Sequence, residues 1–451
     1  MKKLLLITVI LVLFGLSTFA AAKVTEIKIL SPFGSSKLAV EDFVANFNAT
    51  TGKANNWHFS MTTHIDDYVQ VMELAFQSGE MPDIVYAASG LMIKYARQGL
   101  YTAYEDLPGW QEELKRFKPY MQPLLNQVDG KTYSLPFEVL TYKMCYNKDL
   151  FKKAGIVDGK GNPTPPKTWN EVADYAKRIT AIGGGKQYGI IWPMKFVVWA
   201  DWHIFKPFVA SVGHEAFDQK SGTYKFADFK PALDWMMRIK ADKSYFPGPE
   251  NLDIDPGRAQ FAEGNGGMII GLTFDVGVYT YQFPAKVDWD VADLPVIDLG
   301  KRYKEPMLSR GSWVATKEAK SDKNKLAAVS SFLKEWNSDK SLRLWYGMAL
   351  YVPYKPEIIA MPGVVPALKG WAGFANITKG FIQATPPDSS LELEGLTAED
   401  VVRKIFAGQV GVQEGLADLD TRYNAALKNA IADKKVVLPT YTVPNYDISV
   451  K

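Results

Sequence analysis

The densest group of side chains that could bind a ligand is aromatic. Trp192, Trp199 and Trp202 lie within one short segment, WPMKFVVWADW, of a chain with twelve tryptophans. Flat rings of this kind match the C–H faces of pyranose rings, and covering them with sugar removes apolar area from water. Packing inside a hydrophobic core would explain the same residues. The segment is therefore a candidate binding surface with core packing as the alternative.

Polar candidates stand at turns and at expected strand ends. Arg310, just before Gly311-Ser312-Trp313, offers a forked donor for a carboxylate or paired hydroxyls, with a surface ion pair as the alternative. Asp275 could accept hydrogen bonds from hydroxyls or could cap a turn. Ser35 and Ser36 offer hydroxyls and backbone N–H groups at an expected helix start.

The elements that must position these side chains alternate between strand and helix. Apolar runs predict strands over 24–30, 57–63 and 83–87, with amphipathic helices between them. Such alternation favours a parallel sheet covered by helices, and ligands of these sheets bind beyond the carboxyl ends of the strands. Ser35 and Ser36 follow the first expected strand, and Ser89 follows the third.

Length and charge narrow the class of protein. The first 22 residues predict a secretion signal, with Lys2-Lys3, an apolar stretch over 4–16 and Ala20-Ala21-Ala22 before the cleavage point. A membrane anchor is the alternative, but the apolar stretch is shorter than the roughly 20 residues that span a bilayer. Without the leader, about 430 residues indicate two domains. The formal charge of +3 falls to +1, which gives no electrostatic argument for binding nucleic acid or an anionic membrane.

Cysteine and histidine argue against a lipid anchor, a disulfide and a metal site. Cys145 is the only cysteine, and none follows the expected cleavage point, so we expect a protein free in a periplasmic or secreted space. The four histidines lack metal-ligand spacing, and no G-x-S-x-G, Walker A or HExxH motif occurs. We therefore expect neither a metal nor a cofactor.

The segment 130–178 carries several ordered local signals. Asn147 is expected to cap a helix over 148–154, Gly155 to end it, and Thr168 with Glu171 to form a capping box at the next helix. The order Pro-Phe, Tyr-Asn-Lys, Leu-Phe-Lys-Lys-Ala-Gly and Pro-Pro-Lys-Thr-Trp resembles the extracellular solute-binding proteins of ABC importers, in the branch typified by maltose-binding protein. Residues 261–271 and 406–427 extend the resemblance over essentially the whole mature chain.

This resemblance implies an α/β, two-lobed periplasmic-binding-protein fold of type II, with discontinuous lobes joined by a hinge. The first lobe would comprise 23–137 plus 296–354, and the second 138–295 plus 355–451, with chain crossings near 137–141, 294–295 and 352–356. The implied function is the soluble component of an ABC importer, a monomer that is not an enzyme. It would bind a sugar or oligosaccharide between the lobes, close around it, and deliver it to the membrane permease subunits.

The resemblance also points to particular residues. Phe274 stands where the maltose-binding branch carries a sugar-stacking Trp, so stacking is expected over less area. Glu138 lies in the implied hinge strand, where a carboxylate binds sugar hydroxyls or forms a hinge ion pair. His64 and Tyr351 are candidates from family position, and Ser312 and Trp313 from the strand that returns to the first lobe. The branch's aromatic pair before the last helix has no counterpart over 388–397, so we expect a ligand that differs from a linear maltodextrin.

Two alternatives remain open at this point. A secreted glycoside hydrolase needs two facing carboxylates, which 49 acidic residues do not exclude, although none lies in a catalytic motif that we recognise. The same fold could instead bind a polyamine, a metal or a phosphorylated polyol. Polyamines call for acids clustered around aromatics, and the chosen loops carry few acids, which favours sugar. A phosphorylated polyol would use Arg310 with Ser35, Ser36 and Ser312.

Overall fold

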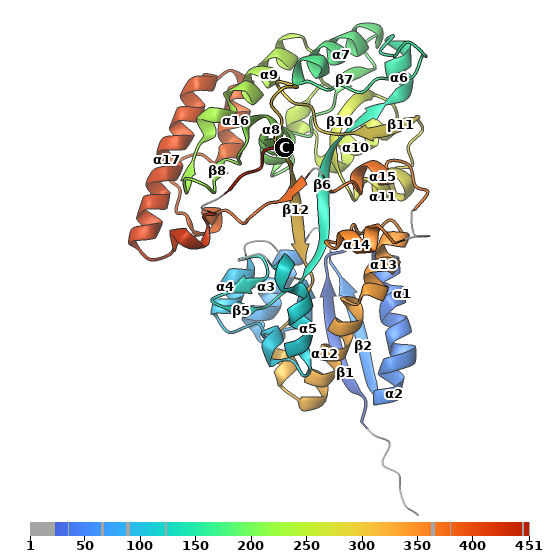
Figure 1. The fold of residues 1–451 in the computed structure, drawn as a ribbon, viewed down its shortest axis with the longest axis vertical. Helices are drawn as coiled ribbons and strands as arrows, with labels where there is room; N and C mark the ends of the chain where they lie inside the picture. The colour runs from blue at the N-terminus through green and yellow to red at the C-terminus, as the bar shows by residue number, and fades with distance from the viewer. Residues whose placement is uncertain are drawn as a thin grey trace, which may run out of the picture.

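The computed structural model describes residues 23–34, 36–64, 67–86, 91–121, 124–361, 366–378, 380–443 and 446–450. The expected leader and two candidate residues, Ser35 and Ser89, lie outside these ranges. The described chain forms two α/β lobes, joined by long strands that run between them (Figure 1). We name the lower lobe of Figure 1 the N-lobe and the upper one the C-lobe. No helix within the described ranges has the length and apolar character needed to cross a bilayer.

The N-lobe is built on a four-stranded sheet in the order β13-β3-β1-β2. Its strands are β1 (Thr25–Ser31), β2 (Trp57–Thr63), β3 (Ile84–Tyr86) and β13 (Trp313–Ala315). β1 pairs in parallel with β2 and β3, whereas β13 returns antiparallel to β3. The parallel sheet expected from the sequence is confirmed, and the strand ends differ from those expected by one residue or none.

Helices of the N-lobe cover both faces of this sheet. They are α1 (Lys37–Phe47), α2 (Lys53–Asn55), α3 (Tyr68–Ser78), α4 (Leu91–Arg97), α5 (Trp110–Phe117), α12 (Lys323–Trp336), α13 (Asp339–Gly347) and α14 (Pro356–Ile359), and a small hairpin pairs β4 (Gln127–Val128) with β5 (Lys131–Thr132). An aromatic core joins them to the strands: Phe59 of β2 stacks on Phe332 of α12 with ring centroids 5.0 Å apart. Such rings bury large apolar areas, so α12, although distant in sequence, is an integral part of this lobe.

The C-lobe sheet has the order β14-β12-β6-β10-β7, and β11 also pairs with β6. Its strands are β6 (Pro136–Asn147), β7 (Tyr188–Ile190), β10 (Gly266–Leu272), β11 (Trp289–Ala292), β12 (Glu305–Gly311) and β14 (Gly380–Ile382). Every residue of β6 is buried. A strand that is buried on both faces is expected to have a mostly apolar sequence, and the segment that contains β6 is mostly apolar.

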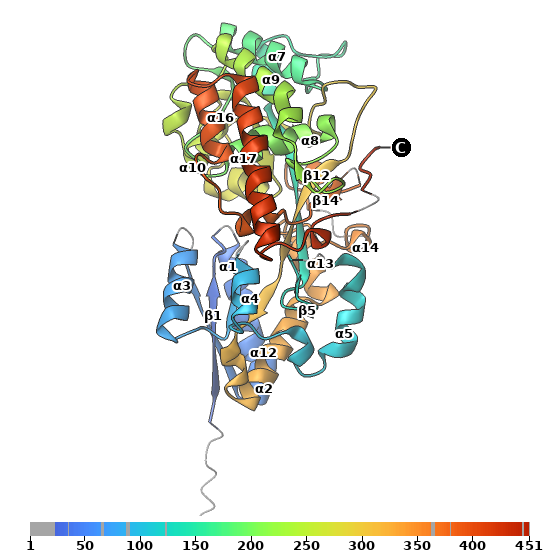
Figure 2. The same cartoon turned by 90° about the vertical axis from the view of Figure 1, so that its left-hand side faces the viewer.

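Helices surround the C-lobe sheet, and a second small hairpin lies beside it. They are α6 (Lys148–Lys153), α7 (Trp169–Ile182), α8 (Lys206–Val212), α9 (Lys230–Ala241), α10 (Ile254–Ala262), α11 (Asp275–Gly277), α15 (Trp371–Phe374), α16 (Ala398–Ala407) and α17 (Val412–Ala432), with β8 (Phe217–Asp218) and β9 (Thr223–Tyr224) forming the hairpin. The red helices α16 and α17 lie on the same side of the molecule as α4 of the N-lobe (Figure 2).

The local signals of segment 130–178 are confirmed. The Asn147 side chain accepts hydrogen bonds from the backbone N–H groups of Asp149 and Leu150 at the start of α6. Gly155 follows α6 with φ +65°, a conformation that glycine adopts without strain. Thr168 and Glu171 form the reciprocal capping box of α7.

Three chain segments form the hinge. β6 and β12 pair antiparallel, with Arg310 opposite Glu138 and an irregularity between Arg310 and Gly311. The third segment lies on the other side of β6, where the Val139 N–H donates to the Val352 carbonyl at 2.8 Å. The crossings expected near 137–141 and 352–356 fall at the first and third of these segments, but α14 still packs on α13, so we propose that the N-lobe extends through Ile359.

The second crossing lies further along the chain than 294–295, where we expected it. Val296 donates its N–H to the Lys167 carbonyl, and Tyr303 donates to Ala210, so residues 296–303 are held by elements of the C-lobe. Only at β12 does the chain leave for β13 of the N-lobe sheet. We therefore propose that the C-lobe continues to β12 and that the N-lobe resumes after it.

Candidate ligand cleft

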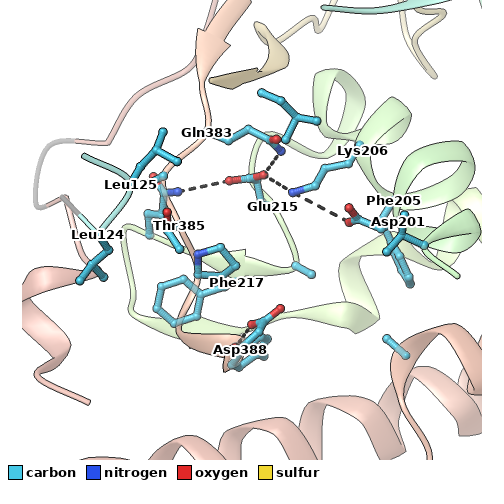
Figure 3. Close-up of a pocket in the computed structure, with 18 of the residues that line it drawn as sticks. Leu124, Leu125, Asp201, Phe205, Lys206, Glu215, Phe217, Gln383, Thr385 and Asp388 are labelled. Carbon is cyan, nitrogen blue, oxygen red and sulfur yellow. Dashed lines mark hydrogen bonds and ion pairs between the residues drawn. The ribbon is translucent and has the colours of Figure 1, made fainter. Parts of the chain in front are cut away.

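A cavity of about 420 Å³ lies between the lobes, beside the hinge strand β12. Residues from α4 and from the segments before β6 contribute its N-lobe side, whereas η4 (Asp201–Phe205), the β8–β9 hairpin and α16 contribute its C-lobe side (Figure 3). The lining residues used below are Asp201, Phe205, Lys206, Glu215, Phe217, Tyr224, Phe226, Gln383, Asp388 and Glu399. The cavity is large enough to enclose part of a small organic ligand.

Four aromatic side chains line one side of this cavity. Tyr224 and Phe226 stack with their ring centroids 5.8 Å apart, and Phe217 meets Tyr224 edge-on at 5.2 Å. Phe205 meets Phe226 edge-on at 5.7 Å. These contacts fix the four rings in place, so this side of the cavity is rigid and apolar.

A lysine and a glutamate meet inside the cavity. Lys206 Nζ lies 2.5 Å from Glu215 Oε1 and 3.9 Å from Asp201 Oδ1. Gln219 donates to Glu215 Oε2 at 3.2 Å, and Gln383 donates to Glu215 Oε1, as Figure 3 shows. Burial opposes the charge of Lys206, but Asp201 and Glu215 outweigh it and raise the pKa of the ammonium group above its ordinary value.

Three further carboxylates line the cavity around this pair. Burial raises the pKa of Asp201 and of Asp388 above the ordinary value. Burial also raises the pKa of Glu399 to about 7, although its carboxylate accepts the backbone N–H groups of Ala200 and Asp201 at 2.9 and 3.0 Å. The cavity is thus an acidic environment in which each added negative charge is unfavourable.

A second aromatic group lies close to the cavity residues in the chain: Trp202 follows Asp201 in η4, and Arg310 stands between Ser309 and Gly311 in β12. Trp202 and Phe274 are both half-buried, with ring centroids 6.3 Å apart. The guanidinium groups of Arg258 and Arg310 lie over the Phe274 ring, at 5.2 and 6.0 Å from its centroid. We name Trp202, Phe274 and Arg310 the aromatic wall. It offers flat apolar surface beside a forked hydrogen-bond donor.

Four predicted residues meet where the N-lobe joins the hinge. Arg310 Nη2 lies 2.6 Å from Glu138 Oε1, and the carboxylate is 1% exposed. Burial raises the pKa of Glu138, with Arg310 opposing the rise. The hydroxyls of Ser36 and Tyr351 lie 2.6 Å apart, and the Tyr351 ring is within electrostatic range of Glu138 and Arg310. The ion pair, one of the two interpretations of Glu138 and Arg310, is present, and contact of either residue with a ligand stays a prediction.

Other predicted residues lie elsewhere. Trp192 and Trp199 are 0% exposed and pack edge-on against each other in the C-lobe core. Trp313 is buried in the N-lobe against Phe33 and Trp336. These three rings expose no surface to a ligand, so core packing, the alternative named from the sequence, describes them.

The remaining polar candidates have local roles. Asp275 accepts the Leu272 N–H at 2.8 Å and pairs with Arg258 at 2.8 Å, so it caps a turn beneath the aromatic wall. Ser312 is buried, and its N–H donates to the Leu135 carbonyl at 2.7 Å. His64 is exposed at the end of β2 and pairs with Asp67 at 3.1 Å. Ser35 and Ser89 lie outside the described residues, so they remain predictions.

The cavity's charged residues were not predicted from the sequence. Asp201 stands beside Trp202 and could have been noticed there, whereas Asp388 and Glu399 follow almost two hundred residues later and reach the cavity only through the fold. Within the described ranges, no group of three or more His, Cys, Asp or Glu side chains has the arrangement of a metal site. The cavity therefore offers hydrogen-bonding and electrostatic contacts.

Comparisons with known proteins agree with this architecture. Residues 34–341 match the family described as bacterial extracellular solute-binding protein. A protein of Brucella abortus named as a binding protein is 24% identical over 377 residues, which are 75% of this chain and 84% of the relative. The sn-glycerol-3-phosphate-binding periplasmic protein of the same organism is 36% identical, but only over 114 residues, or 24% of this chain and 25% of the relative. The maltose/maltodextrin-binding domain of Bdellovibrio bacteriovorus, solved with maltotriose, has a TM-score of 0.67 at 18% identity and covers 90% of this chain and 100% of its own.

Proposed function

This chain belongs to the bacterial extracellular solute-binding proteins, and on that premise we propose that it binds a carbohydrate between its lobes for an ABC importer. The observation that carries the proposal is the aromatic wall. Two half-buried rings, Trp202 and Phe274, have their centroids 6.3 Å apart, and the Arg310 guanidinium lies over one of them. A sugar ring can cover the exposed parts of the two rings while its hydroxyls reach the charged groups at the edge.

Selectivity follows from the polar groups of the cleft. The Arg310 fork donates to vicinal hydroxyls, and the cavity carboxylates accept from others. A sugar with a hydroxyl in the wrong position would leave one of these groups desolvated and without a partner, which costs more than the missing bond itself. The maltotriose-bound neighbour supports the sugar class, although at 18% identity it supports no particular sugar.

Transport requires that binding be sensed by the importer. A ligand that contacts both lobes favours the closed arrangement through its differential affinity for it, and the three hinge segments allow such closure. We propose that the protein works as a soluble periplasmic monomer, that it docks transiently on the permease subunits, and that it releases the sugar unchanged.

A phosphorylated polyol fits the cleft less well, despite the local similarity to a glycerol-phosphate-binding protein. The cavity places Asp201, Asp388 and Glu399 near the space that a phosphate would enter, beside the Lys206–Glu215 pair. An added dianion would meet like charges in a partly desolvated site, which is unfavourable. A polyamine is the second candidate, because the cavity combines acids with the aromatic rings of Phe217, Tyr224 and Phe226.

A thermal-shift screen tests the proposal. Mono- and oligosaccharides, sn-glycerol 3-phosphate and spermidine would each be added to the mature protein. Binding to the folded state alone raises stability with the logarithm of ligand concentration, by about 2.7 kcal/mol at one hundred times Kd. We expect a carbohydrate to raise Tm by several degrees and to be recovered intact by chromatography. A response to spermidine or the phosphate alone, or consumption of the sugar, would overturn the proposal.

A further inference from the structure

The cavity holds more negative than positive groups. Its lining has four carboxylates, Asp201, Glu215, Asp388 and Glu399, and one lysine, Lys206. A neutral sugar has no need of this excess, because hydroxyls are satisfied by uncharged partners as readily as by carboxylates. Asp201 and Asp388 keep part of their surface open to solvent, so this excess of negative charge is accessible to a cationic group of a ligand.

One of the four carboxylates is already compensated. Glu215 receives Lys206 at 2.5 Å on one oxygen and Gln219 at 3.2 Å on the other, with Gln383 as a further donor. Lys206 lies nearest to Glu215 and forms a second, longer ion pair with Asp201 at 3.9 Å. Glu399 is held differently, by two backbone N–H groups and by Arg403 at 3.5 Å.

Asp201 and Asp388 are compensated less closely than Glu215, since Asp201 shares Lys206 at a distance of 3.9 Å. Asp388 accepts the Tyr224 hydroxyl, and no lysine or arginine of the described ranges forms an ion pair with it. The two carboxylates are near enough to repel each other electrostatically. They come from separate elements on the C-lobe side, η4 and the segment after β14, and both side chains lie at the cavity in Figure 3.

An independent observation also indicates a missing donor. Gln383 is 7% exposed and lines the cavity, and its amide nitrogen is used by Glu215. Among the described residues, its Oε1 finds no hydrogen-bond donor. A buried acceptor without a partner is unfavourable, so a ligand that donates an N–H or O–H to this atom would bind more tightly.

We propose that the ligand carries a protonated amine, as an amino sugar does, and that this amine is held by Asp201 and Asp388. Gln383 Oε1 accepts a further N–H or O–H from the same ligand. The inference rests on the proposed function for the sugar part, whereas the amine is derived from the cavity alone. An ammonium group has three donors and no acceptor, so it suits carboxylates and an amide oxygen together. The rings of Tyr224 and Phe226 add surface that also attracts cations.

Calorimetric titration of matched sugar pairs tests this inference. Each pair consists of a neutral sugar and its 2-amino counterpart: glucose and glucosamine, galactose and galactosamine, and cello-oligosaccharides with de-N-acetylated chito-oligosaccharides, all at pH 6. Spermidine is titrated separately, as an amine that carries no sugar. We expect at least one amino sugar to bind about tenfold or more tightly than its neutral partner, the gain of one charge-assisted hydrogen bond. Its affinity should fall as salt is raised.

Three variants connect the effect to the cavity. Asp201→Asn and Asp388→Asn keep the side-chain shape and should each remove most of the preference for the amine. Asp234→Asn is the matched control, because Asp234 pairs with Lys230 on the exposed face of α9 and is not among the cavity residues. A thermal melt of each variant checks folding, and the salt dependence of the wild-type protein provides a test that needs no variant.

The outcomes separate the two proposals. Equal or tighter binding of the neutral partners would overturn the amine while leaving carbohydrate binding intact. Binding of spermidine without any sugar would support the amine and overturn the carbohydrate. A preference for the amine that survives both Asn variants would overturn the assignment to Asp201 and Asp388, and failure of every arm would overturn both proposals.

Discussion

Arg310 and Glu138 form an ion pair of 2.6 Å across the two central hinge strands, in direct cross-strand register. The carboxylate is buried, whereas the arginine side chain keeps 32% of its surface exposed. Arg310 therefore has two roles: it compensates a buried charge, and it lies over the ring of Phe274. The pair holds the arginine at the junction of the lobes, where a ligand would meet it.

Removing the arginine should therefore cost stability as well as binding. Arg310→Met leaves Glu138 buried without its counter-charge, and breaking such a pair costs about 3 kcal/mol or more. Urea unfolding should show this loss, and the double variant Arg310→Met with Glu138→Gln should recover a large part of it. A loss that the second substitution fails to reduce would contradict the assigned compensation.

Trp199 and Trp202 are expected to respond in opposite ways. Trp199→Ala empties a fully buried site, which costs about 3–5 kcal/mol of unfolding free energy. Trp202→Ala removes a half-buried ring of the aromatic wall, so it should weaken sugar binding about tenfold with a smaller loss of stability. Thermal melts and calorimetry on both proteins make the comparison. If Trp199→Ala weakened sugar binding more than Trp202→Ala, the ligand would not bind at the aromatic wall.

Phe274 offers a test by enlargement. Phe274→Trp extends the flat surface beside Trp202, and we expect sugar affinity to rise a few-fold, because roughly 25 cal/mol is gained per Å² of apolar area covered. Phe274→Leu keeps the apolar character but removes the flat face, and serves as the matched comparison. Equal affinities for the three proteins would show that this ring does not contact the ligand.

Glu399 should make stability depend on pH. Its pKa in the folded protein is about 7, raised by burial from an ordinary 4.5, so the folded state binds the proton more tightly than the unfolded state. Its stabilising contribution is complete below about pH 4.5 and is lost as the pH rises through about 7. Between pH 5 and pH 8, Tm of the wild-type protein should therefore fall further than Tm of Glu399→Gln. If Tm of the two proteins changed with pH in the same way, the raised pKa of Glu399 would be contradicted.

Much of the scaffold could be predicted because its signals are local. The cap at Asn147, the box at Thr168 and Glu171, and the glycine stop at Gly155 each depend on residues within one turn of each other. The β1–β2–β3 core of the N-lobe sheet followed from apolar runs that alternate with amphipathic helices. The order of such signals also sufficed to identify the family.

The ligand site was less predictable, because exposure and long-range contact decide it. Trp192, Trp199 and Trp202 share one segment and one chemistry, yet only Trp202 keeps part of its surface outside the core. Asp201 and Asp388 meet at the cavity across most of two hundred residues, and no local pattern relates them. The second hinge crossing that we propose at β12 lies later than the one expected from the sequence, because backbone hydrogen bonds tie residues 296 and 303 to the C-lobe and no local pattern reveals such bonds.

The most direct measurement of the central claim is a calorimetric titration of the best sugar from the screen into three proteins: wild type, Trp202→Ala with Phe274→Ala, and Asp234→Asn as the control. Our account predicts one site per chain in the wild-type and control proteins, and a loss of affinity larger than the roughly tenfold loss expected for Trp202 alone when both rings are removed. Wild-type affinity in the double alanine variant, with the fold intact by circular dichroism, would contradict carbohydrate binding at the aromatic wall.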